Sequence, residues 1–282
     1  MYSKAYVEIT NICNLHCSFC HGTKRDLKRM SFGEFARIAD SLRGITKYLY
    51  LHVLGEPLTH PMLPAFIEYA NKLGFKVAIT TNGTLLDKVG ESLIRAKAYK
   101  VNISLHSFEE QSSLENQKKY IDSCISFASA ASAEGVLCVL RLWNRTADET
   151  SYEGKLNEYT LKLLHESFPE QWHTSVRGAR IHDKLHLEYG DRFEWPDANI
   201  EPLGDRVFCH GLSDQFAILC DGTVTPCCLD AEGDIALGNI FESDIRSILS
   251  SERALAITQG FAKKIATEKL CRRCGYARRF KL

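Results

Sequence analysis

Three cysteines stand within eight residues near the start of the chain, with three and then two residues between them. They are Cys13, Cys17 and Cys20. Three thiolates at this spacing can bind three irons of a four-iron cluster, whose full set of protein ligands would be four. The missing ligand leaves one iron open, and an open position usually separates a catalytic metal site from a structural one. A zinc site with His16 as the fourth ligand is the alternative, but zinc sites usually add a second cysteine pair, which this triplet lacks nearby.

A second group of cysteines occupies the last quarter of the chain: Cys209, Cys220, Cys227, Cys228, Cys271 and Cys274. Four thiolates from an early pair and a late pair can saturate a second four-iron cluster, and the same set would also suit a structural zinc ion. Cys220 alternates with Phe216 and Ile218 in a strand-like run, so we interpret it as a core residue. Cys124 and Cys138 lie in apolar stretches, where cysteine behaves as a small hydrophobe.

The composition excludes several classes of protein. The chain has 282 residues, with 35 Lys and Arg against 35 Asp and Glu, so its formal charge is zero. This balance provides no overall field to attract nucleic acid or an anionic membrane. No apolar run reaches the ~20 residues of a membrane helix, and the first four residues lead into a strand pattern rather than a signal peptide. We therefore expect a cytoplasmic protein, in which clustered cysteines bind metal rather than form disulfides.

Short β-rich runs alternate with helical patterns over the first two thirds of the chain. The predicted strands cover residues 5–9, 48–53, 77–80, 101–105, 137–142 and 176–181. Ser31 and Glu34 have capping-box spacing at the start of the first helix, and Gly74 is expected to end the second. This alternation predicts βα units that form a parallel sheet or partial barrel. The cysteine triplet follows the first strand directly, so it belongs at the carboxyl end of the strands, which carries the chemistry in α/β barrels.

The alternation ends near Gly190, where a segment with Trp195 and Pro196 leads into the second cysteine group. We therefore predict two domains, a core barrel over residues 1–195 and a small cysteine-rich domain over residues 196–282.

With these residues in view, the chain resembles the radical S-adenosylmethionine (radical SAM) enzymes. Their signature is a cysteine triplet with this spacing and an aromatic residue before the third cysteine, here Phe19. The run Leu54-Gly55-Glu56-Pro57 is similar to the family's glycine-glycine-glutamate-proline motif, with Leu54 in place of the first glycine. Thr81-Asn82-Gly83-Thr84 and Asn102-Ile103-Ser104-Leu105 also resemble family patterns. Each motif alone is common, and their order at the ends of successive strands makes the match specific.

The resemblance implies which residues bind the cofactor SAM. The expected set is Phe19, Gly55, Glu56, Pro57, Asn82, Ser104 and Arg141. In the family, the turn that contains Gly55 receives the SAM amino group largely through backbone atoms, and Arg141 is a candidate for its carboxylate. No catalytic side chain is assigned. Four residues near predicted strand ends could face a substrate or serve structure alone: His106, Arg177, Arg180 and His182.

The resemblance also implies a fold and a chemistry. The fold is a partial (β/α)6 barrel of the TIM type, an α/β fold, followed by a small C-terminal cysteine-rich iron–sulfur domain. In the family, SAM chelates the open iron of a [4Fe-4S] cluster through its amino and carboxylate groups. One electron then cleaves SAM to a 5′-deoxyadenosyl radical, which abstracts hydrogen from the substrate, so the cofactor carries the difficult step.

The C-terminal cysteines resemble those of the Twitch domain, a shortened relative of the SPASM domain that binds auxiliary clusters. This resemblance implies Cys209, Cys227, Cys271 and Cys274 as the ligands of an auxiliary [4Fe-4S] cluster. Cys227 is preferred to its neighbour Cys228 because it keeps the family's spacing from Gly222. The further cysteines of a full SPASM domain are missing after Cys274, so we expect one auxiliary cluster.

The function implied by this resemblance is a two-electron oxidation of the substrate, with the auxiliary cluster as electron acceptor. Relatives with the shortened domain include 2-deoxy-scyllo-inosamine dehydrogenase, which oxidises a secondary alcohol, and larger SPASM relatives mature ribosomal peptides or proteins. We therefore expect a small-molecule dehydrogenase, with peptide or protein maturation as the alternative. The alternative of another class is a zinc-stabilised, non-catalytic binding module. A peptide substrate would need a separate leader-binding partner, because the chain begins at the first barrel strand.

The last twenty residues are basic. They include Lys263, Lys264, Lys269, Arg272, Arg273, Arg278, Arg279 and Lys281. A solvated surface is one interpretation, and a landing patch for an acidic electron donor such as flavodoxin or ferredoxin, or for an anionic substrate, is the other.

Overall fold

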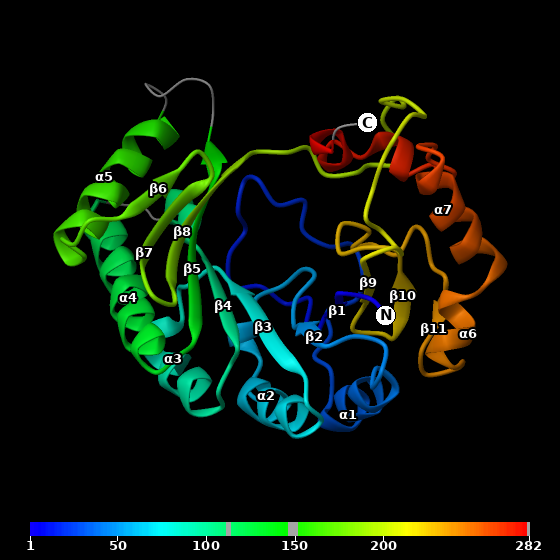
Figure 1. Ribbon diagram of the computed structural model, residues 1–282, viewed down its shortest axis with the longest axis horizontal. Helices are drawn as coiled ribbons and strands as arrows, with labels where there is room; N and C mark the ends of the chain where they lie inside the picture. Colours follow the sequence, from blue (N-terminus) through cyan, green and yellow to red (C-terminus); the bar gives the residue numbers. More distant parts are fainter. Residues whose placement is uncertain (111–113, 146–151, 281–282) are drawn as a thin grey trace.

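A curved layer of parallel strands forms the inner wall of the N-terminal two thirds of the protein. The computed structural model describes residues 1–110, 114–145 and 152–280 (Figure 1). The parallel strands in this part of the chain are β1 (Lys4–Val7), β2 (Tyr48–Tyr50), β3 (Lys76–Thr81), β4 (Lys100–Ser104), β5 (Leu137–Arg145) and β8 (Leu185–Asp191). Each pairs in register with the next, as βα units require. The predicted α/β partial barrel is confirmed.

Helices cover the outer face of these strands (Figure 1). They are α1 (Phe32–Ser41), α2 (Leu63–Lys72), α3 (Leu86–Arg95), α4 (Leu114–Ala133) and α5 (Tyr152–Ser167). Ser31 and Glu34 form the predicted capping box at the start of α1. Gly74 has φ 87° just after α2 and ends that helix as predicted, because glycine adopts this conformation without steric cost. The helices bury Phe35 and Phe66 completely against the sheet.

The prediction that residues 176–181 form the sixth parallel strand of the barrel was wrong. The chain forms an antiparallel hairpin there, from β6 (His173–Ser175) to β7 (Gly178–His182), and β7 then pairs antiparallel with β8. Lys184 has φ 64° in the turn between β7 and β8, so the chain reverses before it can return in parallel. The second parallel partner of β5, on the side away from β4, is therefore β8.

The C-terminal segment extends the same sheet. Its strands are β9 (Gln215–Ile218), β10 (Thr223–Thr225) and β11 (Gly238–Asn239), followed by α6 (Ile245–Leu249) and α7 (Glu252–Ala262). β9 lies beside β1 and pairs with it in parallel, so the described residues form one sheet in the order β11-β10-β9-β1-β2-β3-β4-β5-β8-β7-β6 (Figure 1). This pairing places the second cysteine group beside the first barrel strand. The division at residue 195 stays a prediction.

Short 3-10 helices complete the described elements: η1 (Pro57–Thr59), η2 (Leu105–Glu110), η3 (Cys271–Arg273) and η4 (Tyr276–Arg279). Within the described residues, no helix combines the length and the apolar composition needed to span a bilayer.

Candidate functional site

The cysteine triplet lies on the loop between β1 and α1, and hydrogen bonds close the base of this loop. Asn11 Nδ2 donates to Asp26 O at 2.9 Å, and Lys28 N donates to Asn11 Oδ1 at 2.8 Å. Thr10 Oγ1 donates to Lys28 O at 3.0 Å. The loop therefore leaves and re-enters the barrel at one place, with all three cysteines between.

Two thiols of the triplet accept backbone hydrogen bonds. Leu15 N lies 3.5 Å from Cys13 Sγ, and Gly22 N lies 3.4 Å from Cys20 Sγ. Cys13 and Cys20 are exposed and Cys17 is half-buried. Burial raises the pKa of Cys13, and the N–H of Leu15 opposes this rise. Such N–H donors favour the thiolate, which is the form that binds iron.

The predicted SAM turn packs directly on the cysteine loop. Gly55 has φ 73°, and a Cβ at this position would lie 2.4 Å from Thr10 O, so only glycine fits. Glu56 is buried, and its carboxylate accepts hydrogen bonds from Thr81 Oγ1 and Asn82 N, both at 2.7 Å. Burial raises the pKa of Glu56 to about 7, although these hydrogen bonds act against the rise. Glu56 thus fixes the turn to the end of β3, and Pro57 begins η1 beside it.

Asn82 connects the cysteine loop with the end of β4. Its Nδ2 donates to Asn14 Oδ1 at 3.0 Å and lies 3.9 Å from Cys13 Sγ. The hydroxyl of Tyr120 contacts both Asn82 O, at 2.7 Å, and Ser104 O, at 3.1 Å. Two residues predicted from separate motifs are therefore held by one side chain of α4.

The Tyr120→Phe variant is expected to lower the free energy of unfolding by about 1–3 kcal/mol, because a buried acceptor loses its donor. Denaturant unfolding measures this change. Tyr69→Phe is the matched control, since its hydroxyl donates to Asp40 Oδ2 on the surface at 2.9 Å. Equal losses in the two variants would contradict the role assigned to Tyr120.

A cavity of about 650 Å³ lies on the inner side of the sheet, and Phe19, Ser104 and Arg141 all line it. The Phe19 ring lies 4.9 Å from the ring of His106, centroid to centroid. Trp195 Nε1 donates to Phe19 O at 3.0 Å. Burial lowers the pKa of His106 to about 4, so its imidazole is neutral near pH 7. Phe19 is thereby held over the end of β4.

Arg141 already has a protein partner. Its Nε lies 3.2 Å from Glu188 Oε2 on β8, and its guanidinium carbon lies 4.5 Å from the ring centroid of Trp143. Glu188 is 38% exposed on its side chain and also lines the cavity. An arginine stacked and paired in this way is pre-organised for one more anionic contact. Its predicted role toward the SAM carboxylate stays a prediction.

The four predicted auxiliary cysteines line the far side of the same cavity: Cys209, Cys227, Cys271 and Cys274. All eleven cysteines lie in the described part of the chain, and none forms a disulfide. Burial raises the pKa of Cys271, and negative charge on Cys209 and Cys274 would raise it further. Burial likewise raises the pKa of Cys274 to about 11. Across residues 1–110, 114–145 and 152–280, no three His, Cys, Asp or Glu side chains are arranged around one point as ligands of a single metal ion.

Cys228 and Cys220, the two other cysteines of the C-terminal group, have different contacts from the four predicted ligands. Cys228 lines the cavity, but its thiol bonds to Tyr6 on β1, and burial raises its pKa to about 11. Cys220 is buried, and its sulfur lies 3.6 Å from Arg25 Nη1. Both side chains therefore contact the N-terminal part of the chain. The choice of Cys227 stays a prediction.

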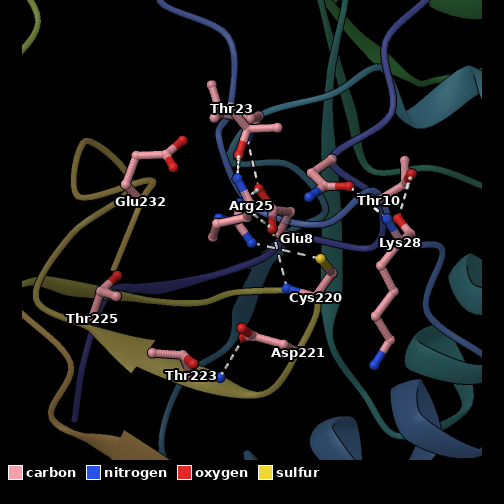
Figure 2. Close-up of polar contacts among 12 residues, drawn as sticks. Glu8, Thr10, Thr23, Arg25, Lys28, Cys220, Asp221, Thr223, Thr225 and Glu232 are labelled. Carbon is pink, nitrogen blue, oxygen red and sulfur yellow. Dashed lines mark hydrogen bonds and ion pairs between the residues drawn. The ribbon is translucent and has the colours of Figure 1, made fainter. Parts of the chain in front are cut away.

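One buried carboxylate, Glu8, connects the cysteine loop with the C-terminal segment through Arg25 and Cys220 (Figure 2). It also contacts the predicted SAM turn. Both of its oxygens lie 2.7 Å from Arg25 Nη2 on the cysteine loop. Its Oε1 also accepts from Leu54 N at 3.2 Å, and its Oε2 accepts from Cys220 N at 3.1 Å. Lys24 N, next to Arg25, bonds to the carboxylate of Glu232. Glu8 is fully buried and the Arg25 side chain is 14% exposed, so this is an interior ion pair.

Glu8, Arg25 and Trp195 are positioning residues that were not predicted from the sequence. A charged residue at an inward position of an apolar strand was the available signal for Glu8. The candidates Arg177 and Arg180 are exposed on the β6–β7 hairpin and do not line the cavity, whereas His106 does. The tail arginines bind backbone carbonyls: Arg272 contacts Ala266, Arg273 contacts Ile200, Arg278 contacts Leu203 and Arg279 contacts Asp191.

Comparison with known proteins shows which family the chain belongs to. Residues 7–137 match the Radical SAM superfamily, and residues 194–275 match the SPASM iron–sulfur cluster-binding domain. A probable GTP 3′,8-cyclase of Methanococcus maripaludis is 33% identical over 83% of this chain and 87% of its own length. The antilisterial bacteriocin subtilosin biosynthesis protein AlbA of Bacillus subtilis is 25% identical over 97% of this chain. The chain spans 65% of the length of AlbA.

Solved structures share the fold. The crystal structure of BtrN in complex with AdoMet and 2-DOIA has a TM-score of 0.61 at 16% identity, covering 97% of this chain and 93% of BtrN. Streptococcus suis SuiB bound to precursor peptide SuiA also has a TM-score of 0.61 at 16% identity, covering 98% of this chain and 72% of SuiB. At this level of sequence identity, both similarities show a shared fold only.

The chain belongs to the radical SAM superfamily and carries a C-terminal SPASM-type domain. Its cofactors are therefore SAM, a SAM-binding [4Fe-4S] cluster and auxiliary iron–sulfur clusters in the C-terminal domain. The donor sets fit these groups. The N-terminal loop presents thiols with N–H donors beside the SAM turn, and the C-terminal cysteines gather at one cavity wall.

Proposed function

We propose that this protein oxidises a small-molecule substrate by two electrons, and that the substrate binds in the cavity between the two groups of cysteines. When bound, the N-terminal cluster and SAM supply the 5′-deoxyadenosyl radical that abstracts hydrogen from the substrate. Cys13, Cys17 and Cys20 would hold this cluster. Cys209, Cys227, Cys271 and Cys274 would hold one auxiliary cluster, which would accept the second electron from the substrate.

The cavity is the observation that carries this proposal. One continuous space is lined by Phe19 and Ser104 at the SAM end and by Cys209 and Cys227 at the other. Its volume of about 650 Å³ lies within the usual range of about 300–1,000 Å³ for small-molecule sites. A substrate in this space would contact both ends at once. Exclusion of water from such a site would protect a radical from side reactions.

The chain's own residues supply orientation and a proton acceptor. Phe19 packs on His106, and both side chains line the cavity. Oxidation of an alcohol also releases a proton, and the Glu188 carboxylate faces the cavity from β8. Arg141 holds this carboxylate in place at 3.2 Å. Glu188 and Asp230 are the carboxylates that line the cavity, and Glu188 is the one proposed to receive the proton.

The test uses the full chain, reconstituted anaerobically with iron and sulfide. We expect about eight irons per chain, four for each cluster. With dithionite and SAM, the protein should release 5′-deoxyadenosine. With a deuterated metabolite extract, deuterium should enter 5′-deoxyadenosine while one metabolite loses two hydrogens. SAM cleavage without any such metabolite would contradict the small-molecule proposal.

Peptide maturation is the second candidate, and the sequence likeness to AlbA over 97% of this chain favours it. SuiB, which shares the fold, is bound to a precursor peptide. On this candidate, deuterium would enter 5′-deoxyadenosine from a deuterated precursor peptide and not from the metabolite extract. Flavodoxin and ferredoxin are the proposed electron donors in both cases.

A further inference from the structure

The interior of the barrel carries cationic and aromatic side chains where a packed barrel would carry apolar ones. In closed (β/α)8 barrels, the inward positions are filled mostly by Val, Ile and Leu. Here the cavity is lined by Lys4 and Tyr6 of β1, Tyr50 of β2, Lys100 of β4 and, just past β2, His52. Such side chains do not stabilise a dry core, because a buried charge needs a partner. This interior is therefore suited to a polar ligand.

The strand register places Tyr6, Tyr50 and Lys100 at one level of the barrel. Tyr6 pairs with Tyr50, Tyr50 with Ala78 and Ala78 with Lys100, so they form one row across adjacent strands. Lys4 lies two residues before Tyr6 on the same face of β1. The two lysines thus lie on β1 and β4, the strands on either side of β2 and β3, and both line the cavity.

The same register sets the distance to the SAM end. Lys100 and Ser104 are the first and last residues of β4 and share its inward face. Four residues of strand span about 13 Å. A ligand bound to Lys100 would therefore extend along the inside of the barrel toward Ser104 and Phe19.

The cations in this cavity exceed the carboxylates that could neutralise them. Arg141 is paired with Glu188, whereas neither Lys4 nor Lys100 forms an ion pair within the described residues. The Lys4 ammonium lies 5.7 Å from the Tyr50 ring centroid, which stabilises a cation only weakly. Burial lowers the pKa of Lys100. The charges of Arg141 and Lys4 act in the same direction, whereas the charge of Glu188 opposes them.

A nearby polar atom is also unsatisfied. His52 Nδ1 is buried and has no hydrogen-bond partner. An unpaired buried polar atom is unfavourable to folding. Lys4 and Lys100 share one requirement that no ion pair among the described residues meets, an anionic partner.

We propose that Lys4 and Lys100 bind the anionic group of the substrate, a carboxylate or a phosphate, at the amino end of the barrel strands. The anion would fix one end of the substrate, and the reacting carbon at the other end would lie toward Phe19 and Ser104. This inference rests on the proposed function only in taking the ligand to be the substrate. Binding of an anion at the two lysines is a separate property of the chain.

The test is anaerobic calorimetry on the full reconstituted chain, with SAM present and without reductant. The probes are inorganic phosphate, glycerol 3-phosphate and succinate, with glycerol as the neutral control. We expect at least one anion to bind and glycerol not to bind. Tighter binding of the phosphates would identify a phosphate site, and tighter binding of succinate a carboxylate site. Lys4→Met or Lys100→Met should weaken that binding at least tenfold.

Lys76→Met is the matched control, because Lys76 also begins a strand but is exposed and does not line the cavity. Its anion affinity should equal that of the unaltered chain. Lys100→Glu should abolish anion binding while the thermal unfolding midpoint stays near that of Lys100→Met. Absence of binding for all three anions, or binding that survives both lysine substitutions, would overturn the inference. If the protein did not cleave SAM but still bound an anion through the two lysines, only the proposed function would be rejected.

Discussion

The Cys17→Ala variant is expected to release no 5′-deoxyadenosine from SAM above the level seen without protein. Cys17 is the middle member of the triplet, and its thiolate would hold one of only three protein-bound irons. Loss of a group that merely supports a metal ligand already costs about 10–100-fold, so loss of a ligand should cost more than about 100-fold. Anaerobic assay with dithionite and SAM measures the product directly. Iron content should fall to about four per chain, the content of the auxiliary cluster alone.

Two control variants test whether the loss of SAM cleavage is specific to the N-terminal cysteines. Cys138→Ala removes a buried thiol from β5, away from both cysteine groups, and should keep SAM cleavage. Cys274→Ala should keep SAM cleavage but stop oxidation of the substrate, because it would remove a proposed ligand of the auxiliary cluster only. If Cys17→Ala kept both its iron and its 5′-deoxyadenosine, the N-terminal site would have been assigned to the wrong residues.

The parts of the site that local spacing defines could be predicted from the sequence. Cys13, Cys17 and Cys20 lie within one loop, so their proximity needs no knowledge of the fold. Gly55 and Asn82 could be added because parallel strands bring their carboxyl ends to one edge of a sheet. The structure brings Asn82 Nδ2 to 3.9 Å from Cys13 Sγ, across sixty-nine residues of sequence.

The parts that depend on pairing between distant segments could not be predicted. β9 pairs with β1 across more than two hundred residues, and the strand pattern of residues 215–218 does not specify its partner. The β6–β7–β8 segment shows the same limit, because three short β-rich runs allow either a hairpin or a crossover. The turn at Lys184, which decides between them, carries no glycine. Lys4 and Lys100 were likewise missed, since their shared cavity follows from the register of four strands.

The ion pair of Glu8 and Arg25 also depends on how the chain folds and could not be predicted from the sequence. Its removal should lower the stability of the protein strongly. In Arg25→Met, the Glu8 carboxylate would stay buried without its guanidinium partner. Loss of one member of a buried pair costs about 3–5 kcal/mol. For a protein of this size, that corresponds to a fall of about 6–10 °C in the thermal unfolding midpoint. Circular dichroism of the anaerobic protein measures the fall.

The same substitution should weaken SAM binding, because Glu8 also accepts the N–H of Leu54 at the start of the SAM turn. Lys28→Met is the matched control. It removes an ion pair with Glu34 from the same loop, but the Lys28 and Glu34 side chains are 36% and 30% exposed, so the cost should stay below about 1 kcal/mol.

The double variant Glu8→Gln/Arg25→Met tests whether the unpaired charge of Glu8 causes the loss of stability in Arg25→Met. The glutamine amide that replaces the Glu8 carboxylate would keep an oxygen for one backbone N–H without leaving a buried charge, so the double variant should be more stable than Arg25→Met alone. A coupling energy of about 0.5–3 kcal/mol in this cycle would show that the two side chains act as a pair. Purely additive losses would mean that Arg25 stabilises the loop without Glu8. The cysteine loop, the SAM turn and the C-terminal segment would then be held by their backbone contacts and not through one shared carboxylate.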